Sequence, residues 1–380
     1  MKPPSHRDTD VLNSLWLGAS VALWVVLVGI GDAHDPISTK VTWTREIGPL
    51  VHRRCVSCHT RGGFSFPLTS YEEARPWAVA IKEETLAGEM PPWGAASGIG
   101  HFANDRQLTR HEIELIAAWV DGGAPRELPP TNPGSRIADP NAEGAPAATP
   151  NVDAPTDRTP ARAPDRPPGT RVPLATAVIE SATERTASVT LQVPAGMSLT
   201  AWSFDPGAPA LVSRVELELA SRWLGTWTPG DEPILFPPDA GLALGPSALF
   251  TARISYREPD APTIDQSGIV IWTTREPRAR TVRETTVVRS WRTTSAVEVF
   301  ALRPAGAAAT EVLARFADGA MEPLGAFAAE DTILHPTYRL TRPLTLPAGA
   351  RVETTASVRL LYTDAATRTV KPNVRRRPRR

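Results

Sequence analysis

Helical periodicity marks the N-terminal third of the chain. Ile47, Leu50 and Val51 recur at the spacing of one helix face, and Thr44 stands where a side-chain cap would begin that helix. The helix would deliver the chain directly into Cys55. We expect its apolar face to pack against the last helix of the same small domain.

That last helix has clear start and stop signals. Thr109 and Glu112 form a capping box, and Gly122 with the next glycine is the stop. Four apolar positions follow the spacing i, i+3, i+4 and i+7: Ile113, Ile116, Ala117 and Val120. Residues 70–87 predict a further helical stretch that is interrupted at Pro76. Residues 40–126 are therefore expected to form a small all-α domain.

From residue 173 onward the hydrophobic period changes to two. Apolar and polar residues alternate in residues 215–219, 250–256 and 352–360, and turn residues lie between such runs. Many short strands with regular turn signals predict an all-β sandwich over residues 173–365. The region is long enough for two stacked sandwiches or jelly rolls.

Residues 127–172 separate the two patterns and carry a dense share of the 39 prolines. A segment of this composition buries too little apolar surface to offset its chain entropy, so we predict a disordered linker. The expected protein is multidomain, with the all-α domain and the all-β module joined by this linker. Such a tether would let the helical domain search for a partner while the β module holds its position.

The two ends of the chain carry targeting and charge signals. Residues 1–33 predict a signal peptide cleaved after Ala33, with a retained N-terminal membrane anchor as the alternative. Either outcome places the rest of the chain outside the cytoplasm, in the periplasm or another extracytoplasmic location. Residues 366–380 form a basic tail, which we interpret as solvated, with a membrane-surface or partner contact as the sharper alternative. Lys plus Arg equals Asp plus Glu at 41 each, so the charge gives no argument for nucleic acid.

The cysteine pattern carries the strongest chemical signal. Cys55 and Cys58 are the two cysteines of the chain, and His59 follows directly. This is the haem c attachment pattern, in which two thiols add to the two vinyl groups of one porphyrin and the adjacent imidazole reaches its iron. A redox disulfide would be expected beside a βαβ pattern, which the flanks lack, and a structural zinc site usually takes four Cys or His ligands. We predict one covalent haem c with His59 as the proximal iron ligand.

A closed iron site needs a sixth ligand, and Met90 is the leading candidate. It follows the end of a helix and precedes two prolines and Trp93, a rigid loop that could hold a thioether against the haem face. Two alternatives stay open: Met90 as a core-packing residue, and ligation by His101 in a Gly-rich loop. His52 and His111 are expected to be ordinary surface residues of helices.

Three motifs within residues 41–126 resemble the class I cytochrome c family. They are CVSCH at 55–59, EMPPW at 89–93 and HEIELIAAWVDGG at 111–123. The resemblance implies His59 as proximal ligand, Met90 as distal ligand, and one-electron transfer with a redox partner protein.

The β region resembles a second family, the copper type II ascorbate-dependent monooxygenases, which include peptidylglycine hydroxylases. The resemblance rests on residues 204–207, 225–231, 249–256 and 265–267, and on residues 338–349 for the second β domain of that family. Members of the family bind two coppers through histidines and one methionine.

The departures from the copper family matter more than the matches. Where it has a His-His pair this chain has Ser213-Arg214, where a His precedes a tyrosine it has Ser255-Tyr256, and a His-Met-His segment falls on residues 289–291. His335 is the only histidine after His111, and copper is normally held by several imidazoles, so we expect no copper. Single residues without such partners are assigned to surface or packing roles: His335, Met197 and Met321. Core packing is also the expectation for five tryptophans, with a partner surface as the alternative: Trp202, Trp223, Trp227, Trp272 and Trp291.

The predicted function is one-electron transfer by an exported single-haem cytochrome, with a metal-free β module for docking or scaffolding and no enzymatic step. One alternative is a monooxygenase in which the haem domain feeds a copper site of unfamiliar ligands. Another is a haem-based sensor or binding protein with an open sixth position.

Overall fold

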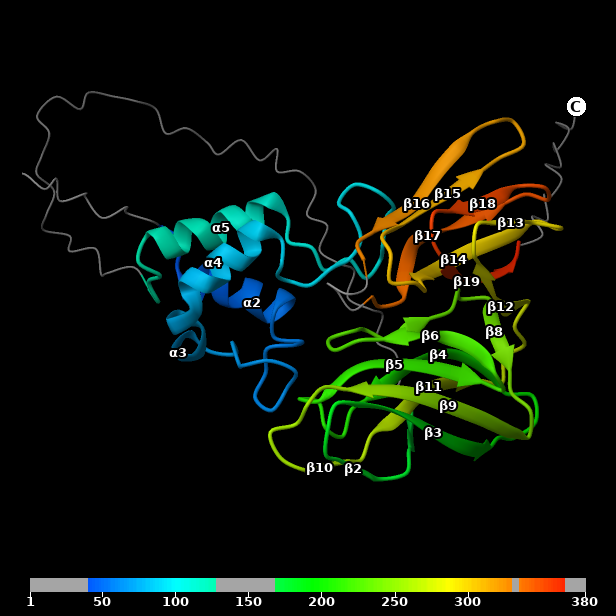
Figure 1. Ribbon diagram of the computed structural model, residues 1–380, viewed down its shortest axis with the longest axis horizontal. Coiled ribbons are helices and arrows are strands. Elements are labelled where there is room, and N and C mark those ends of the chain that lie inside the picture. The colour runs from blue at the N-terminus through cyan, green and yellow to red at the C-terminus, as the bar shows by residue number, and fades with distance from the viewer. Residues whose placement is uncertain (1–39, 128–167, 330–334, 366–380) are drawn as a thin grey trace, which may run out of the picture.

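The computed structural model describes residues 40–127, 168–329 and 335–365, and these residues are mostly β-sheet with few helices (Figure 1). The predicted signal peptide or anchor, the basic tail and nearly all of the predicted linker lie outside the described residues. The linker's predicted end is wrong, because residues 170–172 belong to strand β1, which pairs with β11. In the described part of the chain, no helix has the length and apolar character needed to cross a membrane.

The N-terminal region is helical, as its periodicity predicts. Its elements are η1 (Trp43–Ile47), α2 (Gly48–Arg54), α3 (Tyr71–Ala74), η2 (Arg75–Trp77), α4 (Ala78–Ala87) and α5 (Arg110–Asp121). The capping box of Thr109 and Glu112 is confirmed, with the side chain of each bonded to the backbone N–H of the other. The predicted cap at Thr44 is wrong: Thr42 accepts from the backbone N–H of Arg45, and the Thr44 hydroxyl donates to the carbonyl of Arg126.

One apolar cluster holds these helices together. Ile47, Leu50 and Val51 are each 1% exposed and pack with Ile116 and Trp119 of α5, which confirms the predicted contact between the first and last helices. The interruption at Pro76 is also confirmed, since a 3-10 turn separates α3 from α4.

The β region forms two lobes, consistent with the predicted pair of stacked sandwiches. The first lobe contains β1 (Thr170–Pro173), β3 (Thr183–Gln192), β4 (Ser198–Asp205), β5 (Val212–Leu219), β6 (Arg222–Trp227), β7 (Ile234–Leu235), β8 (Ala240–Ala243), β9 (Ser247–Tyr256) and β11 (Gly268–Thr274), with the ribbon of β2 (Ala177–Ile179) and β10 (Thr263–Asp265). The second lobe contains β12 (Arg280–Val287), β13 (Ser290–Arg292), β14 (Val297–Pro304), β15 (Thr310–Arg315), β16 (Met321–Phe327), β17 (Tyr338–Leu346), β18 (Arg351–Thr354) and β19 (Val358–Asp364).

Each lobe pairs a four-stranded sheet with part of one long sheet. The four-stranded sheets have the orders β3-β9-β5-β6 and β13-β18-β15-β16, and the long sheet runs β1-β11-β4-β8-β12-β19-β14-β17 through both lobes. The parallel pairing of β8 with β12 joins them. Residues 352–360 form two strands, β18 and β19, rather than one alternating run.

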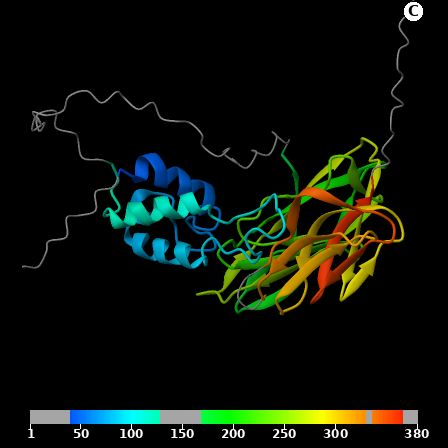
Figure 2. The same cartoon turned by 90° about the horizontal axis from the view of Figure 1, so that it is seen from above.

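The helical region reaches into the second lobe through one segment. Residues 94–104, called the inserted segment below, leave the helices and form bridges from Ala95 to Phe327 and from Phe102 to Leu340 (Figures 1 and 2). Trp93, Ala95 and Phe102 belong to the apolar core of that lobe. The expectation of a freely searching helical domain is therefore wrong, since its own chain is paired with β16 and β17.

Candidate functional site at the Cys55–His59 motif

The Cys55–His59 motif follows directly from the end of α2. Cys55 is the C-cap and donates its N–H to the carbonyl of Val51 at 2.8 Å. The backbone N–H groups of Cys58 and His59 both donate to the carbonyl of Cys55, at 3.1 and 3.0 Å. The three residues therefore share one tight backbone turn, and both cysteines are free and half-buried.

His59 is buried at 9% exposure, and one of its ring nitrogens is fixed. Its Nδ1 lies 2.9 Å from the carbonyl oxygen of Phe66, which can only accept, so Nδ1 carries the proton and donates. Nε2 then holds the lone pair, the form that ligates a metal. Burial lowers the pKa of His59, although the bond to Phe66 acts in the opposite direction, so the ring is neutral at pH 7.

The surroundings of the two thiols disfavour their thiolate forms. Burial, and then the neighbouring Cys58, raises the pKa of Cys55 to about 12. Burial also raises the pKa of Cys58, against the opposing charge of Arg106. Redox-active Cys-x-x-Cys motifs instead have a lowered pKa, because the thiolate is the nucleophile. The redox-dithiol alternative is disfavoured by this environment.

Several large apolar side chains in residues 66–99, which follow the motif in the sequence, are exposed to solvent. Six large ones are between 37% and 61% exposed: Phe66, Trp77, Val79, Leu86, Met90 and Ile99. The ring of Phe66 lies 4.8 Å from that of His59 and stacks on Trp77 at 4.3 Å. Helix α4 buries only Ala78 and Thr85. Phe66 and Trp77 therefore present exposed aromatic surface next to His59.

An ion pair ties the approach to the motif to α5. Arg54 donates to both carboxylate oxygens of Glu112, at 3.0 and 3.2 Å, from a partly buried position. Burial alone would raise the pKa of Glu112, but the hydrogen bonds from Arg54 and Thr109 lower it. The carboxylate thus fixes the end of α2 relative to the capping box of α5.

A turn of the β region covers the other side of the motif. The Cys58 thiol donates to the carbonyl of Pro229 at 3.3 Å, and Gly230 follows at φ +80°. A Cβ at Gly230 would lie 2.9 Å from the Cys58 sulfur. Beside it, Arg106 pairs with the buried Asp231 at 2.7 Å. In the sequence, residues 225–231 carry only a resemblance to the copper monooxygenase family, and no local signal there indicates a contact with the cysteine motif.

The candidate sixth ligands differ in their surroundings. Met90 is 40% exposed, and its backbone N–H donates to the carbonyl of Glu84 at 3.2 Å. The side chain of His101 is exposed, while its carbonyl accepts from the N–H of Thr341. His52 and His111 are exposed as predicted.

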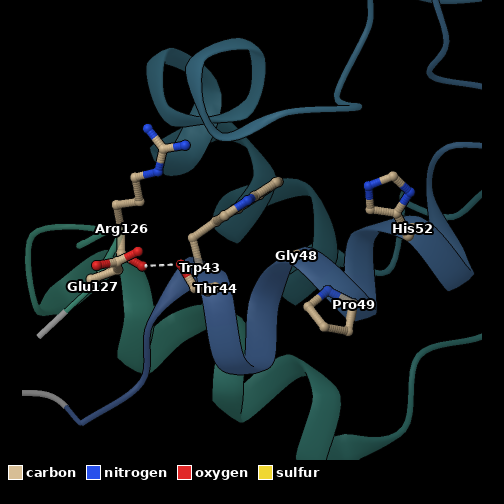
Figure 3. A pocket seen from close by; sticks show the side chains of 7 residues that line it. All are labelled: Trp43, Thr44, Gly48, Pro49, His52, Arg126 and Glu127. Carbon is tan, nitrogen blue, oxygen red and sulfur yellow. Dashed lines mark hydrogen bonds between the residues drawn. The ribbon is translucent and has the colours of Figure 1, made fainter.

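One open hollow lies apart from the motif. It has a volume of about 430 Å³ and is lined by Trp43, Thr44, Gly48, Pro49, His52, Arg126 and Glu127 (Figure 3). The dashed bond in the figure joins Thr44 to the backbone of Arg126. Neither cysteine nor His59 lines this hollow, so it adds nothing to the chemistry of the motif.

The positions compared with copper ligands hold other interactions. The Ser213 hydroxyl donates to the carbonyl of Ser255 at 3.0 Å, and the Tyr256 hydroxyl donates to Asp265 at 2.7 Å. Trp291 packs against Tyr362, with 5.0 Å between ring centroids. Among the described residues, no three His, Cys, Asp or Glu side chains are grouped so that they could hold a metal ion.

The single residues of the β region divide between core and surface. His335 is fully buried, so its packing assignment is correct and its surface assignment is wrong. Met197 packs against the first core, whereas Met321 is 57% exposed and is not a packing residue. Three of the tryptophans are buried in the first core, as expected: Trp202, Trp223 and Trp227.

Comparison with known proteins gives no assignment. The chain matches no protein-family model and no curated protein. Among solved structures it is similar to the major capsid protein P2 of bacteriophage PM2, at 12% identity and a TM-score of 0.27, over 53% of this chain and 99% of that chain. A similarity at this TM-score carries no argument about fold or function.

Proposed function

We propose that this chain is an exported c-type cytochrome that carries one covalent haem c and transfers single electrons to and from a redox partner protein. Cys55 and Cys58 attach the haem, His59 is the proximal iron ligand and Met90 is the distal ligand. The helical region is a class I cytochrome c domain in this proposal. The chain is an electron carrier rather than an enzyme.

The hydrogen bond from His59 to Phe66 carries the proposal. It leaves a neutral imidazole with Nε2 available, beside two thiols in a single tight turn. An imidazole that donates its second nitrogen to a backbone carbonyl is the usual arrangement of a metal-ligating histidine. The uncovered rings of Phe66 and Trp77 supply an apolar wall next to it.

Each residue then has a defined task. The two cysteines hold the group covalently, so that it is retained whatever its oxidation state. His59 orients the group, because the bond to Phe66 prevents rotation of the ring. Haem, when bound, supplies a one-electron iron couple whose potential is raised by methionine opposite histidine. Pro229 and Gly230 cover the Cys58 side and limit the access of water there.

The β region acts as a docking or scaffolding module without copper, derived from the monooxygenase fold. Its support is the replacement of the expected ligand positions by serine, arginine and tryptophan side chains that are engaged in packing or in hydrogen bonds. Stoichiometric copper retained after dialysis of purified protein would contradict a metal-free module and favour a haem-fed monooxygenase.

A sensor function is the second candidate, and one observation favours it. Met90 is 40% exposed, so its thioether is not held by burial in the way the ring of His59 is. A sixth position that opens would bind external ligands. Rapid carbon monoxide binding by the reduced wild-type protein would favour the sensor over the closed electron carrier.

The decisive experiment uses the full chain produced with the haem attachment machinery. A pyridine haemochrome spectrum counts covalent haem, and a reduced-minus-oxidised spectrum with near-infrared detection reports methionine ligation. We expect one haem per chain and a methionine–iron band. Protein without covalent haem would overturn the proposal.

A further inference from the structure

The β region contacts the helical region at Trp93 and Gly94, a few residues after Met90. We infer that Tyr338 and His335 of the second lobe are positioning residues that hold the Met90 segment in place for iron ligation, which rests on the function proposed above. In this inference the β region is more than a scaffold, because two residues buried in its second lobe determine whether Met90 can ligate the iron.

The chain around Met90 is fixed on both sides. On the helical side, the N–H of Met90 donates to the carbonyl of Glu84 at 3.2 Å. On the other side, Pro91 and Pro92 lead to Trp93, which is 7% exposed in the core of the second lobe. Because two prolines restrict the backbone between these anchors, a shift of Trp93 is transmitted to Met90.

Tyr338 is the residue against which Trp93 is placed. The two rings meet edge to face with 4.8 Å between centroids. The hydroxyl of Tyr338 lies 2.7 Å from Nδ1 of His335, and both residues are fully buried. His335 Nε2 lies 2.9 Å from the carbonyl of Ala328, so Nε2 donates there and Nδ1 accepts from Tyr338.

Gly94 completes the contact because it has no side chain. A Cβ on Gly94 would lie 2.2 Å from Cε1 of His335 and 2.8 Å from the hydroxyl of Tyr338. The carbonyl of Gly94 accepts a hydrogen bond from the N–H of Ala328 at 2.8 Å. The carbonyl of the same Ala328 accepts the hydrogen bond from Nε2 of His335. The backbone that follows Met90 is thus seated directly on the Tyr338–His335 pair.

The rest of the inserted segment prevents this seat from sliding. Ala96 is not part of the Tyr338–His335 pair. Its N–H donates to the carbonyl of Ala326 at 2.7 Å, which fixes the register of the inserted segment against β16. At the far end, Asn104 donates to the carbonyl of Thr337 and accepts from the N–H of Arg339, at 3.0 and 2.9 Å. Both ends of the segment are therefore paired with the strands that flank the His335–Tyr338 pair.

The test compares two hydroxyl deletions in the full chain with haem attached. Tyr338→Phe removes the bond to His335, and the control Tyr256→Phe removes an equally short buried bond, to Asp265, in the other lobe. We expect Tyr338→Phe to weaken the methionine–iron band, lower the reduction potential and speed carbon monoxide binding about tenfold, the factor that corresponds to loss of one buried hydrogen bond. Tyr256→Phe and the exposed Ser97→Ala should leave all three unchanged.

The outcomes separate this inference from the proposed function. Wild-type protein without covalent haem overturns both. Covalent haem without a methionine–iron band, or equal spectra and carbon monoxide rates for Tyr338→Phe and Tyr256→Phe, overturns the positioning role and leaves the cytochrome intact. If Tyr338→Phe does not accumulate as folded protein, His335→Gln supplies the same comparison, and a wild-type spectrum in that variant contradicts the inference.

Discussion

The two buried histidines of the described chain differ in one respect that separates a candidate ligand from a packing residue. His59 uses Nδ1 for a bond to the carbonyl of Phe66, and within the described residues its Nε2 makes no hydrogen bond. His335 engages both ring nitrogens, Nδ1 with Tyr338 and Nε2 with the carbonyl of Ala328. Both rings are buried, at 9% and 0% exposure, so it is the second nitrogen that distinguishes a ring able to bind iron from one that ties strands together.

The largest expected effect comes from replacing each of these two histidines by alanine in turn. His59→Ala should abolish the low-spin haem spectrum, because no other imidazole lies in the motif, whereas His335→Ala should keep covalent haem. Visible spectra and haem staining of denatured protein measure both properties. A low-spin spectrum of wild-type intensity in His59→Ala would contradict the role of His59 as the proximal ligand.

His335→Ala should instead lower the free energy of unfolding of the second lobe. It leaves the Tyr338 hydroxyl and the Ala328 carbonyl without this partner and opens a cavity, which together cost about 3 kcal/mol. Chemical denaturation followed by tryptophan fluorescence measures the change, and the exposed His52→Ala is the control. A loss no larger than that of the control would show that His335 is not a fastening residue.

The contact of the β region with Cys58 can be isolated by two glycine substitutions. Gly230→Ala and Gly196→Ala each force alanine to a positive φ, of +80° and +78°, but only the first meets a neighbour, at 2.9 Å from the Cys58 sulfur. We expect about 1 kcal/mol of destabilisation from Gly196→Ala and about 2 kcal/mol from Gly230→Ala. Equal losses of unfolding free energy in Gly230→Ala and Gly196→Ala would mean that the turn at Gly230 is not in close contact with Cys58.

The smallest effect is a pH dependence from Glu112. Its pKa in the folded protein lies below the ordinary value of 4.5, so the carboxylate contributes stability that is present above pH 4.5 and is lost as the pH falls below it. Glu112→Gln should cost about 1 kcal/mol at pH 7 and flatten the stability profile below pH 4.5. Glu114→Gln, at an exposed position of the same helix, is the control, and a profile unchanged by Glu112→Gln would contradict this assignment.

Local signals in the sequence predicted local structure well. The capping box at Thr109, the interruption at Pro76 and the buried face of Ile47, Leu50 and Val51 depend on neighbours within a few residues. The cap at Thr44 was misplaced by two residues because Thr42 and Thr44 are chemically equivalent, and tertiary contact with Arg126 decided between them.

Long-range contacts left no such signal. The pairing of Ala95 with Phe327 joins residues more than two hundred positions apart. In the sequence, the Gly-rich inserted segment that contains Ala95 has the pattern of an ordinary loop. Likewise, nothing local to Pro229 indicates that its carbonyl meets Cys58. Such contacts depend on how the completed lobes fit together, which hydrophobic periodicity does not encode.

The inserted segment also changes what it means to divide this chain in two. Since residues 94–104 belong to the helical side by sequence and to the second lobe by pairing, a backbone cut between residues 128 and 167 would not separate the halves. We expect the two fragments to stay together as a noncovalent heterodimer, through the bridges of the inserted segment and the Arg106–Asp231 ion pair. Conversely, a helical fragment produced alone would expose Trp93 and Phe102 to solvent, and we expect it to aggregate rather than behave as an independent domain.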